Sequence, residues 1–186
     1  MNSLCISQII FYLTLISYIS CVYDFFNYKT KNYMLMSNLL QVKVKKLPHS
    51  EGLPLPSYAT LHSAGVDLLA AISENVTLKP MERFLVPTGI AISLPIGYEA
   101  QVRSRSGLAS KYGVVVVNSP GTIDPDYRGE IFVSMINLGD KDFIIKRGMR
   151  VAQMIISQFS QVNWNIVEDL DETDRSTGGF GSTGLK

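Results

Sequence analysis

An all-β domain of the sandwich, jelly-roll or barrel type is the fold that the sequence predicts, and three observations lead to it. Short stretches alternate between apolar and polar residues, turn-forming prolines and glycines recur roughly every ten residues, and only one brief stretch has a helical pattern. Many short strands without long helices are typical of these architectures. We expect an irregular N-terminal extension before this domain and a flexible, glycine-rich C-terminal tail after it.

Short strands are predicted in order along residues 37–167, which we interpret as the β domain. The strand candidates are 40–46, 84–86, 90–94, 98–103, 114–117, 131–136 and 151–156. The continuous apolar run 114–117 is typical of a strand that is buried on both faces. Residues 108–112 form the one helical stretch. Because no cysteine follows residue 21, the domain must depend on apolar burial rather than on disulfides or thiolate metal sites.

The composition is that of a globular protein without a strong overall charge. The 186 residues are 46% hydrophobic and 18% charged, which excludes collagen-like, coiled-coil and wholly disordered chains. The 17 lysines and arginines balance 16 acidic residues, so the formal net charge is +1. This balance gives no general attraction for nucleic acid, and any site for a polyanion must be local.

Residues 1–36 form an apolar extension unlike the rest of the chain. They contain three charges and both cysteines, but no glycine or proline. The charge-free stretch 1–23 is long enough to span a bilayer, although it lacks the basic start of a secretory signal. The interpretation we favour is a mis-assigned start, with translation beginning at Met34 or Met36. The protein is then expected in the cytoplasm, with membrane contact only if the extension is translated.

Two segments of the domain carry residues suited to phosphate chemistry. Arginines and serines alternate from Arg103 to Ser106, just before the helical stretch, where free backbone N–H groups favour an anion. A surface turn with a serine cap is the alternative. Residues 118–130 predict a rigid hairpin, in which Pro125 biases Asp124 toward an extended backbone. A carboxylate held in this way is suited to orienting a water molecule.

The last 19 residues, 168–186, differ again from the domain. Five acids fall within residues 168–174, which indicates a solvated linker. The following stretch contains four glycines, Arg175 and Phe180. We interpret it as a lid whose amides wrap phosphate oxygens while Arg175 pairs with charge and Phe180 stacks on a base. A frayed terminus is the alternative, because such a strip loses much backbone entropy when it is ordered.

Five motifs together make the chain resemble the trimeric dUTPase family, the deoxyuridine triphosphate nucleotidohydrolases, over essentially all of residues 37–186. They are AGVDLLA at 64–70, RSGLA at 105–109, NSPGTIDPDYRGE at 118–130, GMRVAQ at 148–153 and RSTGGFGSTG at 175–184. Each is weak alone, whereas five in order are highly specific. The resemblance implies a distorted jelly roll that forms a homotrimer. Each active site would take the first, second and fourth motifs from one chain, the third from another and the tail from the last.

The resemblance also implies the reaction. Water would attack the α-phosphorus of dUTP in line and release dUMP and pyrophosphate, which lowers dUTP and supplies dUMP for thymidylate synthesis. Asp124 would be the general base. The triphosphate would carry Mg²⁺, with Asp67 as an outer-shell partner acting through water, in agreement with the preference of magnesium for retaining water.

Roles for the substrate-binding residues follow from the same resemblance. Tyr127 would pack under the sugar and exclude a ribose hydroxyl, and Arg175 would close over the γ-phosphate. The phosphates would be bound by Arg105, Ser106, Gly107 and Gln153. The base would be read by the hairpin residues Asn118, Gly121, Thr122 and Ile123 and covered by the tail residues Phe180, Gly181 and Ser182.

One residue departs from the family pattern, and two other functions stay open. Ser104 stands where the family commonly has proline, which we expect to loosen the phosphate loop without removing a catalytic atom. The first alternative function is an enzyme of the related dCTP deaminase branch. The second is a nucleotide-binding module that uses the same fold without catalysis.

Overall fold

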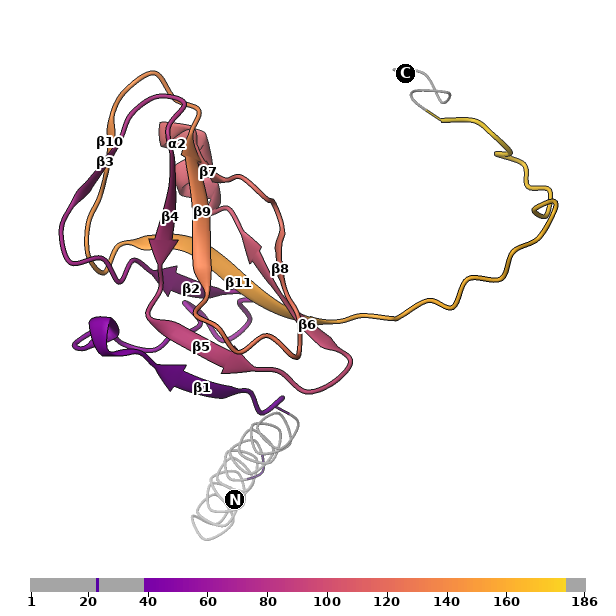
Figure 1. Cartoon of the computed structure of the whole chain (residues 1–186), viewed down its shortest axis with the longest axis horizontal. Coiled ribbons are helices and arrows are strands. Elements are labelled where there is room, and N and C mark those ends of the chain that lie inside the picture. Colours follow the sequence, from indigo (N-terminus) through magenta and orange to yellow (C-terminus); the bar gives the residue numbers. More distant parts are fainter. Residues whose placement is uncertain (1–22, 24–38, 180–186) are drawn as a thin grey trace, which may run out of the picture.

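The regular secondary structure of the described residues is mostly β-strand, as expected from the short alternating stretches of the sequence. The computed structural model describes residue 23 and residues 39–179. The N-terminal extension, apart from residue 23, and the predicted site residues Phe180, Gly181 and Ser182 lie outside the described residues. Between residues 39 and 159 the chain forms one β body, from which the C-terminal segment runs away (Figure 1).

The strands are short and are joined by tight turns. The first half contains β1 (Lys43–Lys46), the 3-10 turn η1 (Pro48–Ser50), β2 (Val66–Leu69), β3 (Val76–Leu78), β4 (Arg83–Pro87), β5 (Ile90–Ser93) and β6 (Tyr98–Arg103). The second half contains α2 (Ser106–Tyr112), β7 (Val114–Val116), β8 (Gly121–Ile123), β9 (Phe132–Asn137), β10 (Phe143–Ile145) and β11 (Arg150–Gln158). An all-β body of this kind confirms the predicted fold class.

All of the strand pairs in the described part are antiparallel, and they form four small sheets. The largest has the order β2-β11-β6-β8, and a second has the order β4-β9-β7. The pairs β1-β5 and β10-β3 complete the body. In Figure 1, β4 and β9 run across the direction of β1 and β5. Strand order is therefore far from sequence order, as in a jelly roll.

The core fills the space between these sheets because alternate residues of each strand point inward. In β9, for example, Val133 and Met135 are fully buried, while Ser134 between them and Ile136 after them are partly exposed. Burying one such apolar side chain contributes about 1.5–3 kcal/mol. The largest fully buried apolar side chains are Leu68, Leu78, Val86, Val114, Ile131, Val133, Met135, Ile145 and Val151.

Asn137 is the one amide among the buried side chains of the described part, and all of its polar atoms are used. Its Nδ2 donates to the carbonyl oxygens of Leu78 at 2.9 Å and Lys141 at 2.8 Å. Its Oδ1 accepts a bond from the Gly139 N–H at 2.9 Å. A buried amide that is satisfied in this way fixes the turn between β9 and β10.

The structure differs from the sequence prediction in three respects. The strands β2, β3, β8 and β10 were not predicted, because three or four residues are too few to show alternation. The prediction that 114–117 is buried on both faces is wrong, since Val115 and Val117 lie on the same face and are partly buried and 45% exposed, respectively. The helix begins at Ser106 rather than at residue 108, and its cap residue Arg105 makes no side-chain capping bond, so the predicted serine cap is absent.

Among the residues that the structure describes, no helix has the length and apolar character needed to cross a membrane.

Helix α2 ends where two glycines come into close contact. Gly113 caps the helix in the left-handed conformation, with φ of 68°. A Cβ at Gly113 would lie 2.6 Å from the Gly139 nitrogen, and a Cβ at Gly139 would lie 2.3 Å from the Tyr112 carbonyl oxygen. The C-terminal end of α2 is thus packed directly against the β9–β10 turn.

We predict that Gly113→Ala lowers the midpoint of thermal unfolding at least twice as much as Gly52→Ala does. Gly52 also has positive φ, 78°, but a Cβ there meets nothing within 4 Å, so its replacement costs only the left-handed strain of about 1–2 kcal/mol. Gly113→Ala adds a clash with backbone. Calorimetry of both variants checks the difference, and equal midpoints would contradict the close contact.

Candidate active site

Asp67 brings two arginines together at one edge of the large sheet. Its Oδ1 accepts a bond from Arg105 Nε at 2.9 Å, and its Oδ2 accepts one from Arg150 Nη1 at 3.2 Å. Arg105 Nη1 also donates to the Arg150 carbonyl oxygen at 3.3 Å. Asp67 lies on β2 opposite Gln153 of β11, and a register irregularity separates Arg150 from Ala152 in the same strand. The pairing of β2 with β11 therefore places a carboxylate between two guanidinium groups.

An open cavity of about 340 Å³ lies beside this cluster. As the first residues of α2, Ser106 and Gly107 have backbone N–H groups without an intrahelical acceptor. Two guanidinium groups against one carboxylate leave an excess positive charge, which together with free amides suits an anionic group. The cavity is lined by Ala59, Ser63, Ala64, Gly65, Asp67, Arg105, Ser106, Gly107, Arg150 and Gln153.

The structure thus brings together five of the predicted site residues and adds one that was missed. Asp67, Arg105, Ser106, Gly107 and Gln153 all line the cavity. Arg150 was not predicted, although it stands in the fourth motif, GMRVAQ. An arginine at the start of an otherwise apolar strand is the sequence signal that could have identified it.

Ser104 links the loop before α2 to two neighbouring strands. The Val116 N–H of β7 donates to Ser104 Oγ at 2.9 Å, and Gln153 Nε2 donates to the Ser104 carbonyl oxygen at 2.9 Å. Gln153 is itself confined, because a Cβ at Gly65 would lie 3.1 Å from its Oε1. The residue next to Arg105 is therefore tied to both β7 and β11.

The segment 118–130 lies at the opposite edge of the same sheet. It does not form the predicted two-stranded hairpin, because its one strand, β8, pairs only with β6; the name hairpin is kept below for this segment. Its first part is strand β8, in which Gly121 pairs with Val102 and Ile123 pairs with Ala100. The Asn118 side chain packs over Gly121, where an added Cβ would lie 3.0 Å from Asn118 Nδ2. Thr122 and Asp124 are exposed, and Ile123 is partly buried.

Tyr127 is hydrogen-bonded to residues before and after it in this segment. Its backbone N–H donates to the Asp124 carbonyl oxygen at 3.2 Å, and its hydroxyl donates to the Glu130 carbonyl oxygen at 2.8 Å. The residue is 42% exposed, so it is accessible to a ligand.

Asp124 and the arginine cluster do not meet within one chain. Strands β11 and β6 lie between β2 and β8, so three strand spacings, roughly 14 Å, separate the two edges. Asp67 is level with Arg103 of β6, whereas Ile123 is level with Ala100, farther along the same strand. The hairpin and the cavity are two separate parts of the molecule.

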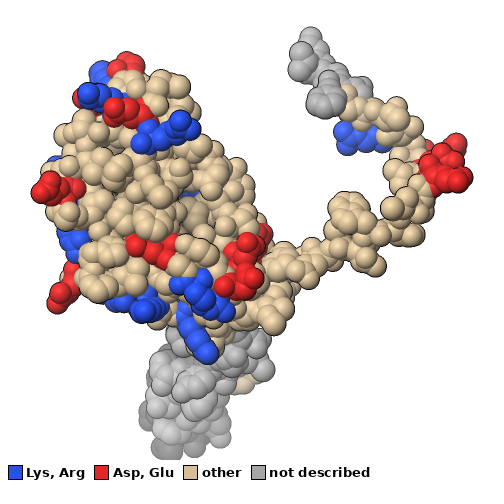
Figure 2. All heavy atoms as spheres, in the orientation of Figure 1, with Lys and Arg blue, Asp and Glu red and all other residues tan. Residues whose placement is uncertain are grey.

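Arg175 is also remote from the cavity. The last backbone bond from the segment to the body runs from the Phe159 N–H to the Gly97 carbonyl oxygen at 3.1 Å. Beyond it the described tail runs away from the body (Figure 1), and Arg175 Nε donates to the Gly178 carbonyl oxygen at 2.9 Å. Figure 2 shows basic and acidic side chains interspersed over the visible face of the body, without an extended patch of one sign.

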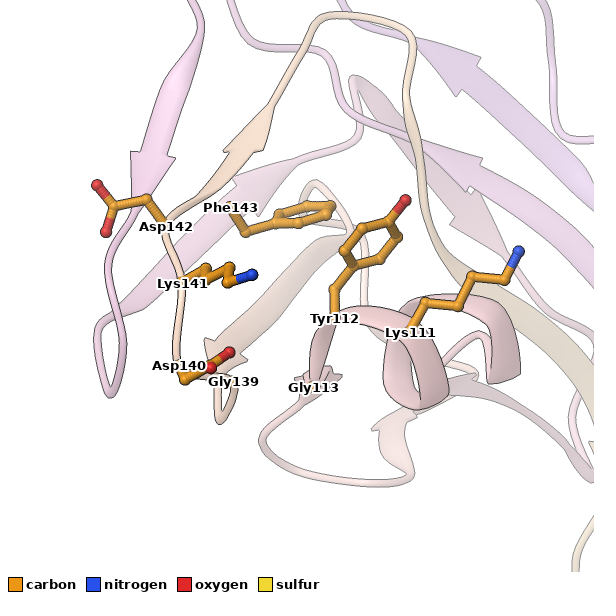
Figure 3. Close-up of a pocket in the computed structure, with 8 residues that line it drawn as sticks. All are labelled: Lys111, Tyr112, Gly113, Gly139, Asp140, Lys141, Asp142 and Phe143. Atoms are coloured by element: carbon orange, nitrogen blue, oxygen red, sulfur yellow. The ribbon is translucent and has the colours of Figure 1, made fainter.

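A second pocket, of about 260 Å³, lies at the other end of α2 (Figure 3). Its walls include Lys111, Lys141 and the aromatic pair Tyr112 and Phe143, whose ring centroids are 5.3 Å apart. None of the predicted site residues lines it. Its charged groups are two lysines and two aspartates, which balance each other.

Comparisons with known proteins agree on one family. A family model described as dUTPase matches residues 51–184. The deoxyuridine 5'-triphosphate nucleotidohydrolase of Orientia tsutsugamushi (strain Boryong) is 60% identical over 148 residues, which cover 79% of this chain and 100% of the relative. The protein of the same name from Rickettsia akari (strain Hartford) is 58% identical, with 80% and 99% covered.

Solved structures give the same result. The Staphylococcus bacteriophage 80alpha dUTPase with dUPNHPP has a TM-score of 0.71 and 27% identity, covering 78% of this chain and 99% of its own. A mutant dUTPase from phage phi11 of S. aureus, described for the coordination of a structural Mg(II) ion, has a TM-score of 0.64 and 25% identity, with 71% and 99% covered.

We predict that Ser104→Ala destabilises the fold near the cavity, because the partly buried Val116 N–H then lacks an acceptor. The expected cost is about 1–3 kcal/mol. Hydrogen exchange should show the Val116 amide exchanging faster, with a lower unfolding midpoint. Ser157→Ala is the control, since Ser157 Oγ makes only an exposed 3.3 Å bond to the Gln158 carbonyl oxygen. A Val116 amide equally protected in both variants would show that Ser104 does not hold β7.

Proposed function

The chain belongs to the dUTPase family, and from this we propose that it hydrolyses dUTP to dUMP and pyrophosphate. The observation that carries the proposal is the cavity in which Asp67 holds Arg105 and Arg150 beside the start of α2. The enzyme is then a dUTP diphosphatase that lowers dUTP and supplies dUMP for thymidylate synthesis, a role suited to the cytoplasm. The curated relatives are nucleotidohydrolases, which does not favour a dCTP deaminase.

The cavity binds the triphosphate in this proposal. Phosphoryl transfer depends mainly on positioning and on neutralising the charge of the equatorial oxygens. Arg105 and Arg150 supply charge, while Ser106 and Gly107 offer backbone amides and Gln153 fixes the loop through Ser104. Because hydrogen bonds hold these residues in place, little reorganisation of them is required during the reaction.

Mg²⁺ is the cofactor that these residues fit, provided that the substrate and water supply most of its ligands. Among the described residues, no three side chains of His, Cys, Asp or Glu gather into a metal site. Asp67 is a single carboxylate whose two oxygens already accept bonds from arginines. Magnesium commonly keeps several waters and binds substrate phosphates, so Asp67 would contact it through water. When bound, the ion would neutralise charge on the triphosphate.

Asp124 is the proposed general base for the attacking water. It follows β8 directly, on a segment whose next residue is Pro125, and it is exposed. Abstraction of a proton by a positioned base is typically worth about 10² to 10⁴ in rate. Asp124 acts on the water while the cavity holds the phosphates.

The hairpin and the tail recognise the nucleoside. The base is surrounded by Asn118, Gly121, Thr122 and Ile123. Because β8 is fixed to β6 by backbone bonds, the groups that recognise uracil are held in place. Tyr127 packs under the sugar and excludes a ribose hydroxyl. The lid is formed by Arg175, Phe180, Gly181 and Ser182, with Arg175 over the γ-phosphate and Phe180 stacked on the base.

A homotrimer with shared active sites explains how these separate parts meet. Asp124 lies across the sheet from the cavity, and another copy can present its own hairpin there. Val162, Trp164 and Ile166, which follow the last strand and precede the acidic segment, are 68%, 86% and 95% exposed, which is unfavourable unless another surface covers them. An apolar groove of about 490 Å³ beside β1 offers such a surface. The 16 steps from Phe159 to Arg175 can span at most roughly 55 Å, enough to reach a neighbouring subunit.

We predict that Asp124→Asn retains affinity for the analogue dUpNHpp but loses about 10²- to 10⁴-fold in turnover of dUTP. The amide keeps the shape of the carboxylate and cannot take the proton. Pyrophosphate release and calorimetry separate the two effects. Asp126→Asn, an exposed change in the same hairpin, is the control and should keep wild-type turnover. Activity within a few-fold of wild type for Asp124→Asn would remove Asp124 as the base.

We predict that two inactive chains restore activity when they are co-assembled. One carries Asp124→Asn and an intact tail, and the other lacks residues 175–186 but keeps Asp124. If hairpin and tail come from different subunits, random assembly of a closed trimer puts both intact parts in about a quarter of the sites. Each chain assembled alone is the control. A mixture no more active than these controls would mean that the hairpin and the tail of each site come from the same chain.

A further inference from the structure

The Tyr127 ring is held by the backbone that follows it. A Cβ at Gly129 would lie 2.4 Å from the Tyr127 hydroxyl oxygen and 2.6 Å from Cζ, so the ring rests against bare backbone. The hydroxyl then donates to the Glu130 carbonyl oxygen at 2.8 Å. The position of Tyr127 therefore depends on where the backbone of Glu130 is fixed.

The Glu130 side chain is anchored to two segments distant in sequence. Its Oε1 accepts a bond from His49 Nε2 at 2.8 Å and another from the Gly89 backbone N–H at 2.7 Å. The Glu130 side chain is only 13% exposed, so these bonds are partly shielded from water. His49 belongs to η1, and Gly89 lies between β4 and β5. One carboxylate thus connects the end of the hairpin to η1 and to the turn between β4 and β5.

These two anchors are themselves rigid. Arg147 Nη1 donates to the His49 carbonyl oxygen at 3.0 Å, and its Nη2 donates to the Glu51 carbonyl oxygen at 2.8 Å. Gly89 has φ of 68°, and a Cβ there would lie 2.3 Å from Ser50 Cβ, so η1 packs directly on Gly89. The Leu47 N–H also donates to the Gly89 carbonyl oxygen at 2.8 Å.

The rest of the hairpin end has only local support. Within the described residues, the hydrogen bonds of residues 124–129 join this segment to itself or to residue 130. Arg128 Nη1 donates to the carbonyl oxygens of Pro125 at 2.6 Å and Tyr127 at 2.8 Å, and the Tyr127 N–H donates to Asp124. The segment is attached to the body at its start by the pairing of β8 with β6 and at its end by Glu130 and Ile131. Ile131 is fully buried, and its N–H donates to the Ile90 carbonyl oxygen at 2.9 Å. Glu130 is thus the residue at this end whose side chain bonds to the body.

We propose that Glu130, held by His49 and the Gly89 amide, is a positioning residue that sets the place of Tyr127 and so determines how strongly the enzyme prefers dUTP over UTP. The inference rests on the proposed function, in which Tyr127 packs under the sugar. When Oε1 is removed, Glu130 loses its side-chain bonds and its carbonyl oxygen is held only through the neighbouring Ile131. The ring that bonds to this oxygen is then less fixed and no longer closes the space beside C2′. A ribose hydroxyl is then admitted. Reading of the base is unaffected, because β8 is held separately by β6.

The test compares kcat/KM for dUTP, UTP and dTTP in the full-length wild type and in Glu130→Ala. We expect the dUTP-to-UTP ratio to fall tenfold or more, while the dUTP-to-dTTP ratio stays within about twofold of wild type. Glu130→Gln should restore most of the preference, since its Oε1 can still accept both bonds. Glu74→Ala, an exposed substitution outside the site, is the control and should leave both ratios unchanged.

Two further variants keep the test decisive if Glu130→Ala folds poorly. His49→Ala leaves the Gly89 bond in place and should lower the dUTP-to-UTP ratio by a smaller factor. Tyr127→Phe removes the bond to Glu130 but keeps the ring, and its effect on the ratio should not add to that of Glu130→Ala, because both break the same link.

Each outcome has a definite meaning. An unchanged dUTP-to-UTP ratio in His49→Ala and in soluble Glu130→Ala would overturn the inference, and so would an equal fall in activity on all three nucleotides, which is the signature of a general structural defect. A wild-type protein that releases no pyrophosphate from dUTP would instead refute the proposed function. A selective fall in the ratio, reversed in Glu130→Gln, supports the inference.

Discussion

The contact on which the site depends is the Asp67 carboxylate between Arg105 and Arg150. Two guanidinium groups in one cavity repel each other, and a carboxylate that bonds to both allows them to remain together while keeping an excess positive charge. The three residues come from β2, β11 and the loop before α2. Pairing of β2 with β11 is thus an element of the fold and also the condition for the triphosphate binding that we propose.

Helix α2 connects the packed core to this cavity. Its last turn is fixed by the contact between Gly113 and Gly139, and the adjoining turn is fixed by the buried amide of Asn137. Its first turn presents Ser106 and Gly107 to the cavity. Because the helix is one short element, packing at its far end also fixes the backbone amides that line the cavity.

The sequence predicted the fold class and much of the cavity, because alternation, turn residues and motifs are local signals. The resemblance supplied Asp67, Arg105 and Gln153, which the structure brings together. It did not identify Arg150, whose contact with Asp67 spans 83 positions in the chain. The bonds of Ser104 to Val116 and of Glu130 to His49 could not be predicted from the sequence either, since each depends on how segments distant in the chain pack together. Short strands such as β3 and β10 carry too few residues to show a period.

The exposed acidic segment before Arg175 has a mechanical consequence. Like charges at Glu168, Asp169, Asp171, Glu172 and Asp174 repel one another and stiffen the chain between the body and its cation. Added salt screens this repulsion and lets the segment contract toward a random coil. The distance that this acidic segment spans is therefore governed by ionic strength, independently of any change in the β-sheets.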